Sequence, residues 1–249
     1  MKLLVCISNV PDTTTKLRFK DNSTAINDIG VQWVINPWDE LALTRAVALK
    51  DEPEAHVSEV WVVNVGLALT EPTLRKCLAM GADKAIRIDA NPKDAFYTAT
   101  QLMTFIQTET FGFVICGIES GDYNGASVGG MLAEILDVPS VSSVSGIRFE
   151  KEHPVIQRDV ANGKEEVTVD GLAVLIVQKG FAKAPGIPNM RGIMMARKKP
   201  LVVMTAIESE PLVTFVEYKL PPVKSQVKLV EANQVAQLVD LLSKEAKVI

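Results

Sequence analysis

Glycines and small polar residues gather between residues 117 and 129, in the segment GIESGDYNGASVG, which joins an expected strand to an expected helix. Glycines let backbone N–H groups approach an anion, and the N-terminus of the following helix adds partial positive charge. Phosphate binding is the chemistry that such a loop can perform. The segment matches neither GxxxxGK[ST] nor GxGxxG, so a long connection that tolerates glycine is the alternative.

Two further loops could complete a nucleotide site. Residues 6–13 bring short side chains and turn residues after the first expected strand, and residues 64–66 follow the second. Ligands of a parallel α/β sheet bind at the carboxyl ends of the strands, where the strand order reverses. We therefore expect the three loops to outline one cleft sized for a nucleotide. Asn36, directly before Pro37, either hydrogen-bonds an adenine or ribose or serves as the entry to a helix.

The sequence contains no recognisable catalytic or metal-binding constellation. The three cysteines are far apart among apolar residues, and CxxC and GxSxG motifs are absent. His56 and His153 lie in polar surroundings that are typical of solvated side chains. We interpret the cysteines as small buried hydrophobes in a reducing compartment, and we expect neither a metal site nor an enzymatic centre.

Composition narrows the class of protein. A length of 249 residues fits one sizeable α/β domain with an appendage, or two small domains. Hydrophobic residues at 47% and charged residues at 22% argue against disorder, and a net charge of −4 argues against a general nucleic-acid binder. The apolar runs are far shorter than the roughly 20 residues of a membrane span. The amino terminus reads as a strand rather than a signal peptide, so we expect a cytoplasmic or organellar-matrix location.

Strand and helix patterns alternate through the first two-thirds of the chain. Strands are expected at residues 2–8, 57–65, 84–88 and 112–117, and helices at 41–49, 70–80, 93–109 and 127–136. This rhythm predicts an α/β fold with a parallel sheet and helices on both faces. Shorter strands are then expected at 146–150, 155–160, 165–169 and 173–178, with a hairpin turn at 161–163.

The last part of the chain has a different character. Residues 183–192 read as a loop rich in proline and glycine, and residues 208–223 carry prolines without a sustained pattern. Residues 231–247 predict an amphipathic helix, whose apolar face holds Val235, Leu238, Val239, Leu242 and Ala246. We expect a domain over residues 1–200 and a C-terminal arm over 201–249, which either embraces a partner or packs back on its own domain.

Several motifs, in their order along the chain, resemble the β subunit of electron transfer flavoproteins. They are VCISNVPD at 5–12, VINPWDELAL at 34–43, LRKCLAMGADKA at 74–85, the segment 117–134, and GIMMARKK at 192–199. The resemblance implies an adenine nucleotide α hydrolase-like (Rossmann-like) domain with a small added β region and a C-terminal helical arm. It further implies a non-catalytic half of a heterodimer, whose α subunit carries the redox FAD.

The resemblance also implies roles by position. AMP, or a second FAD in the electron-bifurcating branch, would contact Cys6, Asn36, Val65, Asp122, Gly125, Ala126, Ser127 and Val128. Asp12 and Thr13 would lie nearest the α-subunit FAD. A recognition segment within 183–199 would dock acyl-CoA-type dehydrogenases through Met190, in the place of an anchoring leucine, beside the basic residues Arg197, Lys198 and Lys199. A membrane quinone oxidoreductase would accept the electrons.

Three departures from the family pattern bear on these roles. Ser8-Asn9 stands where Lys-Arg is usual, Ala126-Ser127-Val128 stands where Asn-Gln-Thr or Ala-Gln-Val is usual, and Lys183-Ala184-Pro185-Gly186 replaces Asn-Glu-Pro-Arg. With fewer polar side chains in the phosphate loop, the backbone must supply more of the contacts. Two alternatives stay open: an electron-bifurcating β subunit that binds a second FAD and uses NADH, and a universal-stress-like homodimer that binds ATP without flavin.

Overall fold

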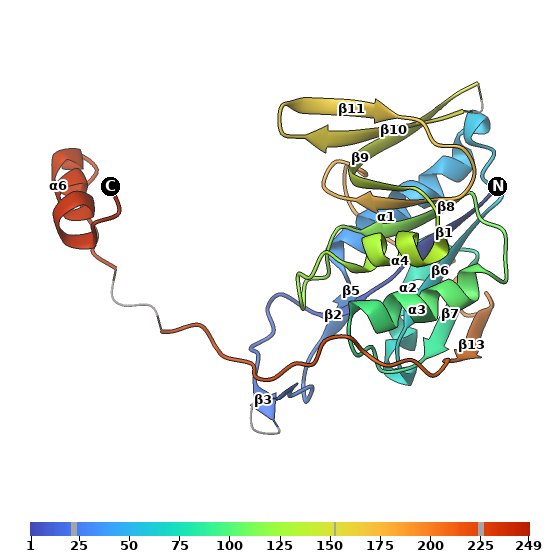
Figure 1. The fold of residues 1–249 in the computed structure, drawn as a ribbon, viewed down its shortest axis with the longest axis horizontal. Coiled ribbons are helices and arrows are strands. Elements are labelled where there is room, and N and C mark those ends of the chain that lie inside the picture. Colours follow the sequence, from blue (N-terminus) through green and yellow to red (C-terminus); the bar gives the residue numbers. More distant parts are fainter. Residues whose placement is uncertain (21–23, 152, 224–226) are drawn as a thin grey trace.

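The computed structural model describes residues 1–20, 24–151, 153–223 and 227–249. At its centre is a nine-stranded sheet in the order β11-β10-β9-β12-β8-β1-β6-β7-β13 (Figure 1). The strands are β1 Lys2–Cys6, β6 Glu59–Val65, β7 Lys84–Asp89, β8 Phe113–Gly117, β9 Ser140–Glu150, β10 His153–Val160, β11 Gly163–Val167, β12 Ala173–Val177 and β13 Leu201–Thr205. Along this order, every neighbouring pair from β9 through β12, β8, β1, β6 and β7 to β13 is parallel. The two pairs at the other end of this sheet, β9–β10 and β10–β11, are antiparallel. The predicted α/β fold is confirmed.

Helices cover both faces of this sheet. They are α1 Pro37–Ala48 and α2 Glu71–Met80 on one face, and α3 Ala95–Ile106 and α4 Val128–Leu136 on the other. Strand β1 shows how the two cores are divided, because Leu3 and Val5 pack with α1 and α2, whereas Leu4 packs with α3 and α4. Strands buried on both faces explain the continuous apolar runs that were visible in the sequence.

The helices begin and end at residues suited to those positions. Pro37 occupies the first turn of α1, where its missing N–H costs nothing. The Asp94 carboxylate accepts the Tyr97 N–H at 2.7 Å and caps α3. Gly81 ends α2 with φ of 128°, and an added Cβ there would lie 2.6 Å from Val47 Cγ1. Ser127 stands at the start of α4.

Two small ribbons and three short 3₁₀ helices complete the body. The ribbons pair β2 Asn9–Pro11 with β5 Trp33–Ile35, and β3 Phe19–Lys20 with β4 Ala25–Ile26. The 3₁₀ helices are η1 Leu49–Asp51, η2 Pro53–Ala55 and η3 Ala68–Thr70. None of these elements was predicted, because two or three residues are too few to show a periodicity.

The later elements differ in several places from the sequence interpretation. Strand β9 begins at Ser140 rather than near residue 146. Helix α5 Met190–Ala196 begins inside the expected loop, because Asn189 Oδ1 accepts the Gly192 N–H at 2.8 Å and caps it. Strand β13 pairs with β7, so the sheet extends beyond residue 200. The hairpin at 161–163 joins β10 to β11 as predicted.

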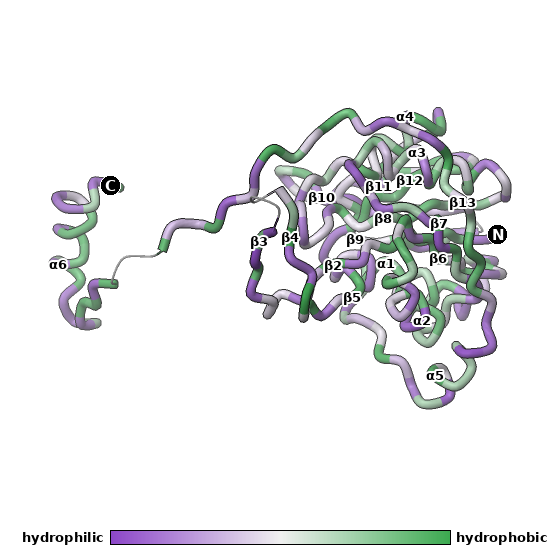
Figure 2. Tube along the Cα trace, turned by 90° about the horizontal axis from the view of Figure 1, so that it is seen from below, coloured by the Kyte–Doolittle hydropathy of each residue, from purple (hydrophilic) through white to green (hydrophobic). Residues whose placement is uncertain are grey.

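The chain ends in a helical segment, as the amphipathic pattern predicted, although it starts four residues later. It consists of α6 Val235–Asp240 and a π-helical turn, η4 Leu241–Ala246. Figure 1 shows this segment apart from the α/β body, and Figure 2 shows apolar residues along it. Val235, Leu238 and Val239 are exposed. Within the described ranges, no helix is long and apolar enough to cross a membrane.

Candidate functional site

The carboxyl ends of β1, β6 and β8 lie together at the centre of the sheet. Strand β1 is placed between β8 and β6, and the chain builds β6 and β7 on one side of it and β8 and β12 on the other. Strand order therefore reverses at β1. This is the position at which open α/β sheets bind ligands, and the three loops expected to form the cleft all leave the sheet there.

Asn36 holds the loop after β8. Its side chain is buried, its Nδ2 donates to Glu119 O at 2.8 Å, and its Oδ1 accepts the Gly121 N–H at 3.1 Å. Its own N–H donates to Ser8 O at 3.0 Å. Asn36 precedes α1 without capping it through its side chain. The side chain thus positions the backbone of the candidate nucleotide loop.

Asp39 performs a similar role and was missed in the sequence. It is 3% exposed, its Oδ2 accepts the Ser8 N–H at 2.7 Å, and its Oδ1 accepts the Gly117 N–H at 3.0 Å. Burial raises the pKa of Asp39 to about 7, against the opposite effect of these N–H donors. Gly117 permits this approach, since a Cβ there would lie 2.3 Å from Asp39 Oδ1.

A sequence signal for Asp39 existed. It occupies the same helical stripe as Ala42, Leu43 and Ala46, all of which are buried. An acid at such spacing on an apolar face needs internal hydrogen-bond donors, and it differs from an acid that merely favours a helix start.

The loop before α4 presents unpaired backbone donors. Asn124 and Ala126 both have φ of 49°, which is the left-handed region that non-glycine residues rarely adopt. Ser127 Oγ donates to Gly125 O at 2.6 Å. In the described part of the chain, the N–H groups of residues 125–128 find no acceptor. These donors adjoin the N-terminus of α4, an arrangement that suits an anion.

Asp122 and the loop after β6 form other parts of this region. Asp122 Oδ1 accepts the Tyr123 N–H at 2.9 Å. Asn64 Nδ2 donates to Ile7 O at 2.8 Å, and the buried Asn64 Oδ1 has no partner among the described residues. A Cβ at Gly66 would lie 2.4 Å from that oxygen, so only glycine allows the loop to pass there.

Cys6 and Val65 have buried side chains, so their main chains are what they can offer a ligand. Interaction with the neighbouring Cys116 side chain of β8, together with burial, raises the pKa of the Cys6 thiol well above its usual range. Val65 packs in the core on the α3 and α4 side. All three cysteines are buried and free, as expected.

Asp12 and Thr13 follow β2 at the same edge of the sheet. Asp12 Oδ1 accepts the Thr14 hydroxyl at 2.5 Å and the Thr14 N–H at 2.8 Å, and these two donors lower the pKa of Asp12. Thr13 is exposed. The two residues are therefore placed in an ordered turn beside the candidate cleft.

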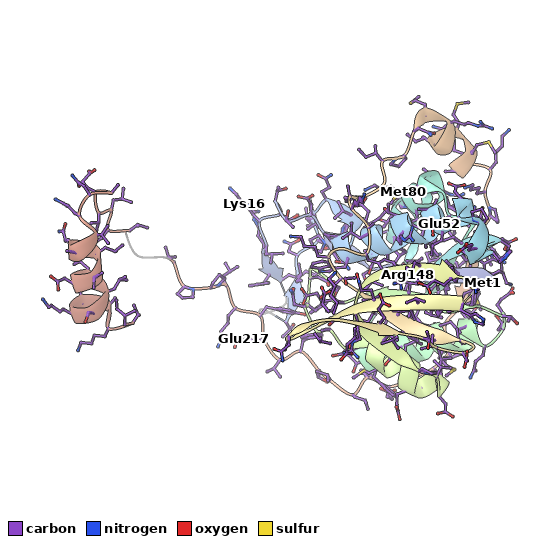
Figure 3. The ribbon with its side chains drawn as sticks, turned by 90° about the horizontal axis from the view of Figure 1, so that it is seen from above. Met1, Lys16, Glu52, Met80, Arg148 and Glu217 are labelled. Atoms are coloured by element: carbon purple, nitrogen blue, oxygen red, sulfur yellow. The ribbon has the colours of Figure 1, made fainter. Side chains whose placement is uncertain are left out.

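The segment 183–199, in which partner recognition is expected, lies elsewhere, on the outer side of α2. Figure 3 shows α5 projecting beyond Met80. Five apolar side chains, four on α5 and one before it, are exposed here. We call them the methionine patch: Ile187, Met190, Ile193, Met194 and Met195. Met190 is 75% exposed. The segment is fixed from beneath, where Gly186 N–H donates to Thr44 Oγ1 at 2.8 Å and Arg75 Nη1 donates to Ala196 O at 2.9 Å.

The three basic residues after α5 do not form one cluster. Arg197 and Lys198 are exposed, whereas the Lys199 ammonium faces the body. Lys199 Nζ donates to Leu78 O at 3.1 Å and to Ala82 O at 2.6 Å, at the C-terminal end of α2. Burial lowers the pKa of Lys199. Its charge therefore caps a helix end.

Across residues 1–20, 24–151, 153–223 and 227–249, no group of three or more His, Cys, Asp or Glu side chains could hold a metal ion. The arrangement at the carboxyl edge is thus one of backbone donors held by buried polar side chains.

The sequence is similar over most of its length to proteins of one family. The family described as "Electron transfer flavoprotein domain" matches residues 23–209. The chain is 32% identical to the electron transfer flavoprotein subunit beta of Bacillus subtilis, over the whole length of both chains. It is 32% identical to that of Syntrophomonas wolfei, over 90% of this chain and 88% of the relative, and 29% identical to the mitochondrial protein of Arabidopsis thaliana over the full length of both. The chain belongs to the electron transfer flavoprotein β-subunit family.

Proposed function

We propose that this chain pairs with an α subunit to form an electron transfer flavoprotein, in which it holds AMP and covers part of the FAD of the α subunit. Membership of the family supports an electron-carrier role. When bound, the flavin supplies the electron-transfer chemistry, while the protein supplies binding and orientation. The residues of this chain would bind, orient and shield, and we propose a cytoplasmic or organellar-matrix location for the complex.

The observation that carries the nucleotide assignment is the row of unpaired N–H groups at residues 125–128. A phosphate placed there would receive several backbone hydrogen bonds and the partial positive charge of the α4 N-terminus. The adenosine part would extend over the ends of β1 and β6, against the main chains of Cys6 and Val65. Asn36 would hold the loop after β8 in position for the nucleotide without contacting the phosphate itself. Asp122 would flank the phosphate loop. The donor set fits a mononucleotide phosphate without any basic side chain.

Two other surface regions, the turn after β2 and the apolar face of α6, are proposed to contact the α subunit. Asp12 and Thr13, in the turn after β2, would lie beside the α-subunit FAD. The exposed apolar face of α6 would bury itself against the α subunit, because exposed apolar stripes mark interaction surfaces.

The methionine patch is the proposed docking site for an acyl-CoA-type dehydrogenase. Methionines adapt their shape to a partner, and Met190 is the most exposed of them. Arg197 and Lys198 would supply positive charge at the rim of the methionine patch. Lys199 is hydrogen-bonded to the end of α2, so it would hold the segment in place and would not contact the partner. A membrane quinone oxidoreductase would receive the electrons from the complex.

One measurement tests the nucleotide assignment directly. The chain is co-expressed with its α subunit, the heterodimer is denatured, and the released nucleotides are separated by chromatography. We expect one FAD and one AMP per heterodimer. Two FAD would instead assign this chain to the electron-bifurcating branch. A colourless homodimer that binds ATP would favour a universal-stress-like protein.

A matched pair of variants tests the location of the phosphate. Gly125 has open space around it, so a side chain can be added there without a clash. Gly125→Asp places a negative charge beside the free N–H groups, and repulsion of roughly 1–4 kcal/mol would weaken AMP binding about fivefold or more. Gly125→Asn has the same shape without the charge and should retain AMP. Equal AMP content in both variants would place the phosphate elsewhere.

A further inference from the structure

Four aromatic side chains from three separate segments stack in one row beside the candidate cleft. Their order is Phe19, Tyr218, Phe215 and Tyr123, with ring centroids 5.6, 5.6 and 4.9 Å apart and interplanar angles of 22°, 19° and 30°. Phe19 belongs to β3, Tyr123 to the loop after β8, and the other two to the segment that follows β13. We call these four residues the aromatic clasp.

The clasp joins surface segments and is not part of a core. Tyr123 and Phe215 are 49% and 41% exposed. Stacked rings attract one another beyond the area they bury, and the hydroxyls of Tyr123 and Tyr218 form a hydrogen bond at 3.2 Å. Burial, and next the hydrogen bond with Tyr218, raise the pKa of Tyr123. The loop after β8 is thus tied to the C-terminal segment by both rings and hydroxyls.

Two polar attachments guide the C-terminal segment to the clasp. The buried Gln101 side chain exchanges two hydrogen bonds of 2.9 Å with the backbone of Ile207. The Asp94 carboxylate accepts the N–H groups of Leu212 and Val213 at 2.7 and 2.9 Å while it also caps α3. These donors lower the pKa of Asp94 although its slight burial opposes them. Beyond this segment the chain leads away from the body towards α6 (Figure 1).

We propose that the aromatic clasp couples nucleotide binding to the C-terminal arm, with Phe215 and Tyr218 as positioning residues for the nucleotide loop. Tyr123 lies between Asp122 and Asn124, in the loop whose free N–H groups would hold the phosphate. A ligand that fixes this loop fixes Tyr123, and the stack then holds the arm. Because coupling between two sites is reciprocal, an arm that is held by a partner also favours nucleotide binding. The inference rests on the proposed nucleotide site.

Trypsin cleavage after Lys219 reports whether the arm is held, because this exposed residue directly follows the clasp. Full-length chain is digested with and without saturating AMP, and the fragment that ends at Lys219 is followed by mass spectrometry. AMP should slow its formation several-fold in the native chain. In Phe215→Ala, cleavage should be fast and insensitive to AMP. Val216→Ala, at an exposed position between the two rings, is the matched control and should behave like the native chain.

Calorimetric titration of the same full-length chains with AMP completes the test. Phe215→Ala should weaken AMP binding about threefold to tenfold, whereas Val216→Ala should leave it unchanged. Tyr218→Phe keeps the ring and should therefore retain most of the coupling. AMP binding of equal affinity in the native chain and Phe215→Ala, with equal protection of Lys219, would overturn the coupling alone. Absence of AMP binding to the native chain would overturn the nucleotide assignment and the coupling together.

Discussion

The loops at the carboxyl edge and the segment around α5 are both surface features, yet they are built in opposite ways. At the carboxyl edge, the buried side chains of Asn36 and Asp39 hold the backbone from within, and the N–H groups of residues 125–128 have no acceptor among the described residues. Around α5, Thr44 and Arg75 bind the segment from the body, Lys199 at its end bonds inward to the end of α2, and apolar side chains are exposed.

This difference indicates what each region can recognise. A fixed row of backbone donors has one shape and suits one small anion, since its hydrogen bonds are directional. An exposed patch of methionines and isoleucines on a supported helix has no directional requirement, so it can adapt to the apolar pocket of a protein. The cleft is preorganised by internal bonds, whereas the side chains of the methionine patch are exposed in the chain alone. Changes to the supports should therefore affect stability and nucleotide content, and changes to the patch should affect docking alone.

Removal of the Asp39 carboxylate should give the largest effect. Asp39→Ala leaves the N–H groups of Ser8 and Gly117 without their acceptors, and we expect a loss of about 3 kcal/mol in the free energy of unfolding together with most of the bound AMP. Asp39→Asn keeps one acceptor and should lose roughly half as much. Urea titration and nucleotide release measure the two effects. A fully stable Asp39→Ala variant would show that these hydrogen bonds do not hold the loops.

The raised pKa of Asp39 gives this support a pH dependence with a definite sign. The folded carboxyl titrates at about 7, whereas the ordinary value is 3.8, so the folded state binds the extra proton between those values. Its contribution to stability is present at low pH and is lost as the pH rises towards 7. Relative to Asp39→Asn, the native chain should gain about 2 kcal/mol between roughly pH 8 and pH 5.5. An unchanged difference across this range would mean that Asp39 has an ordinary pKa.

Met190→Ala tests the other side of the comparison. Truncation of a central apolar anchor costs about 2 kcal/mol in binding, which is roughly thirtyfold in Kd. The rate of electron acceptance from a dehydrogenase at limiting concentration should fall accordingly, with unchanged flavin and AMP content. Met131→Ala, at an exposed methionine on α4, is the matched control and should keep the native rate. A native rate in Met190→Ala would exclude the methionine patch as the docking site.

Much of the fold could be predicted because its signals are local. Alternating strand and helix patterns locate β1, β6, β7, β8 and α1 to α4, and the reversal of strand order places a ligand site at the carboxyl edge. Strand β13 was missed because its five residues are bounded by loops, and its pairing with β7 spans more than a hundred residues of sequence. Such a pairing is decided by tertiary contacts that no local pattern records.

The site could be predicted only as a set of loops. The residue types and the spacing of the glycines indicated the segment 117–129 as a phosphate-binding loop. They could not show that Asn124 and Ala126 adopt left-handed conformations or that the Asn36 side chain binds that loop. The aromatic clasp joins residues 19, 123, 215 and 218, which lie far apart in the sequence. Each is an ordinary aromatic residue until the chain folds. The sequence likewise grouped Lys199 with Arg197 and Lys198, although only the folded chain shows that its ammonium turns inward.

Lys198 and Lys199 offer the finest test of the comparison, because adjacent residues of one type are assigned to opposite sides of it. Lys199→Met removes two hydrogen bonds to the end of α2, and we expect the free energy of unfolding to fall by about 1–2 kcal/mol. Lys198→Met changes an exposed side chain and should alter stability by less than about 0.5 kcal/mol. It should instead slow docking about twofold at low salt, since a charge at the rim acts mainly on association. Thermal unfolding and dehydrogenase kinetics at two salt concentrations separate these outcomes. Equal effects of the two substitutions on both measurements would show that Lys199 does not support the segment any more than the exposed Lys198 does.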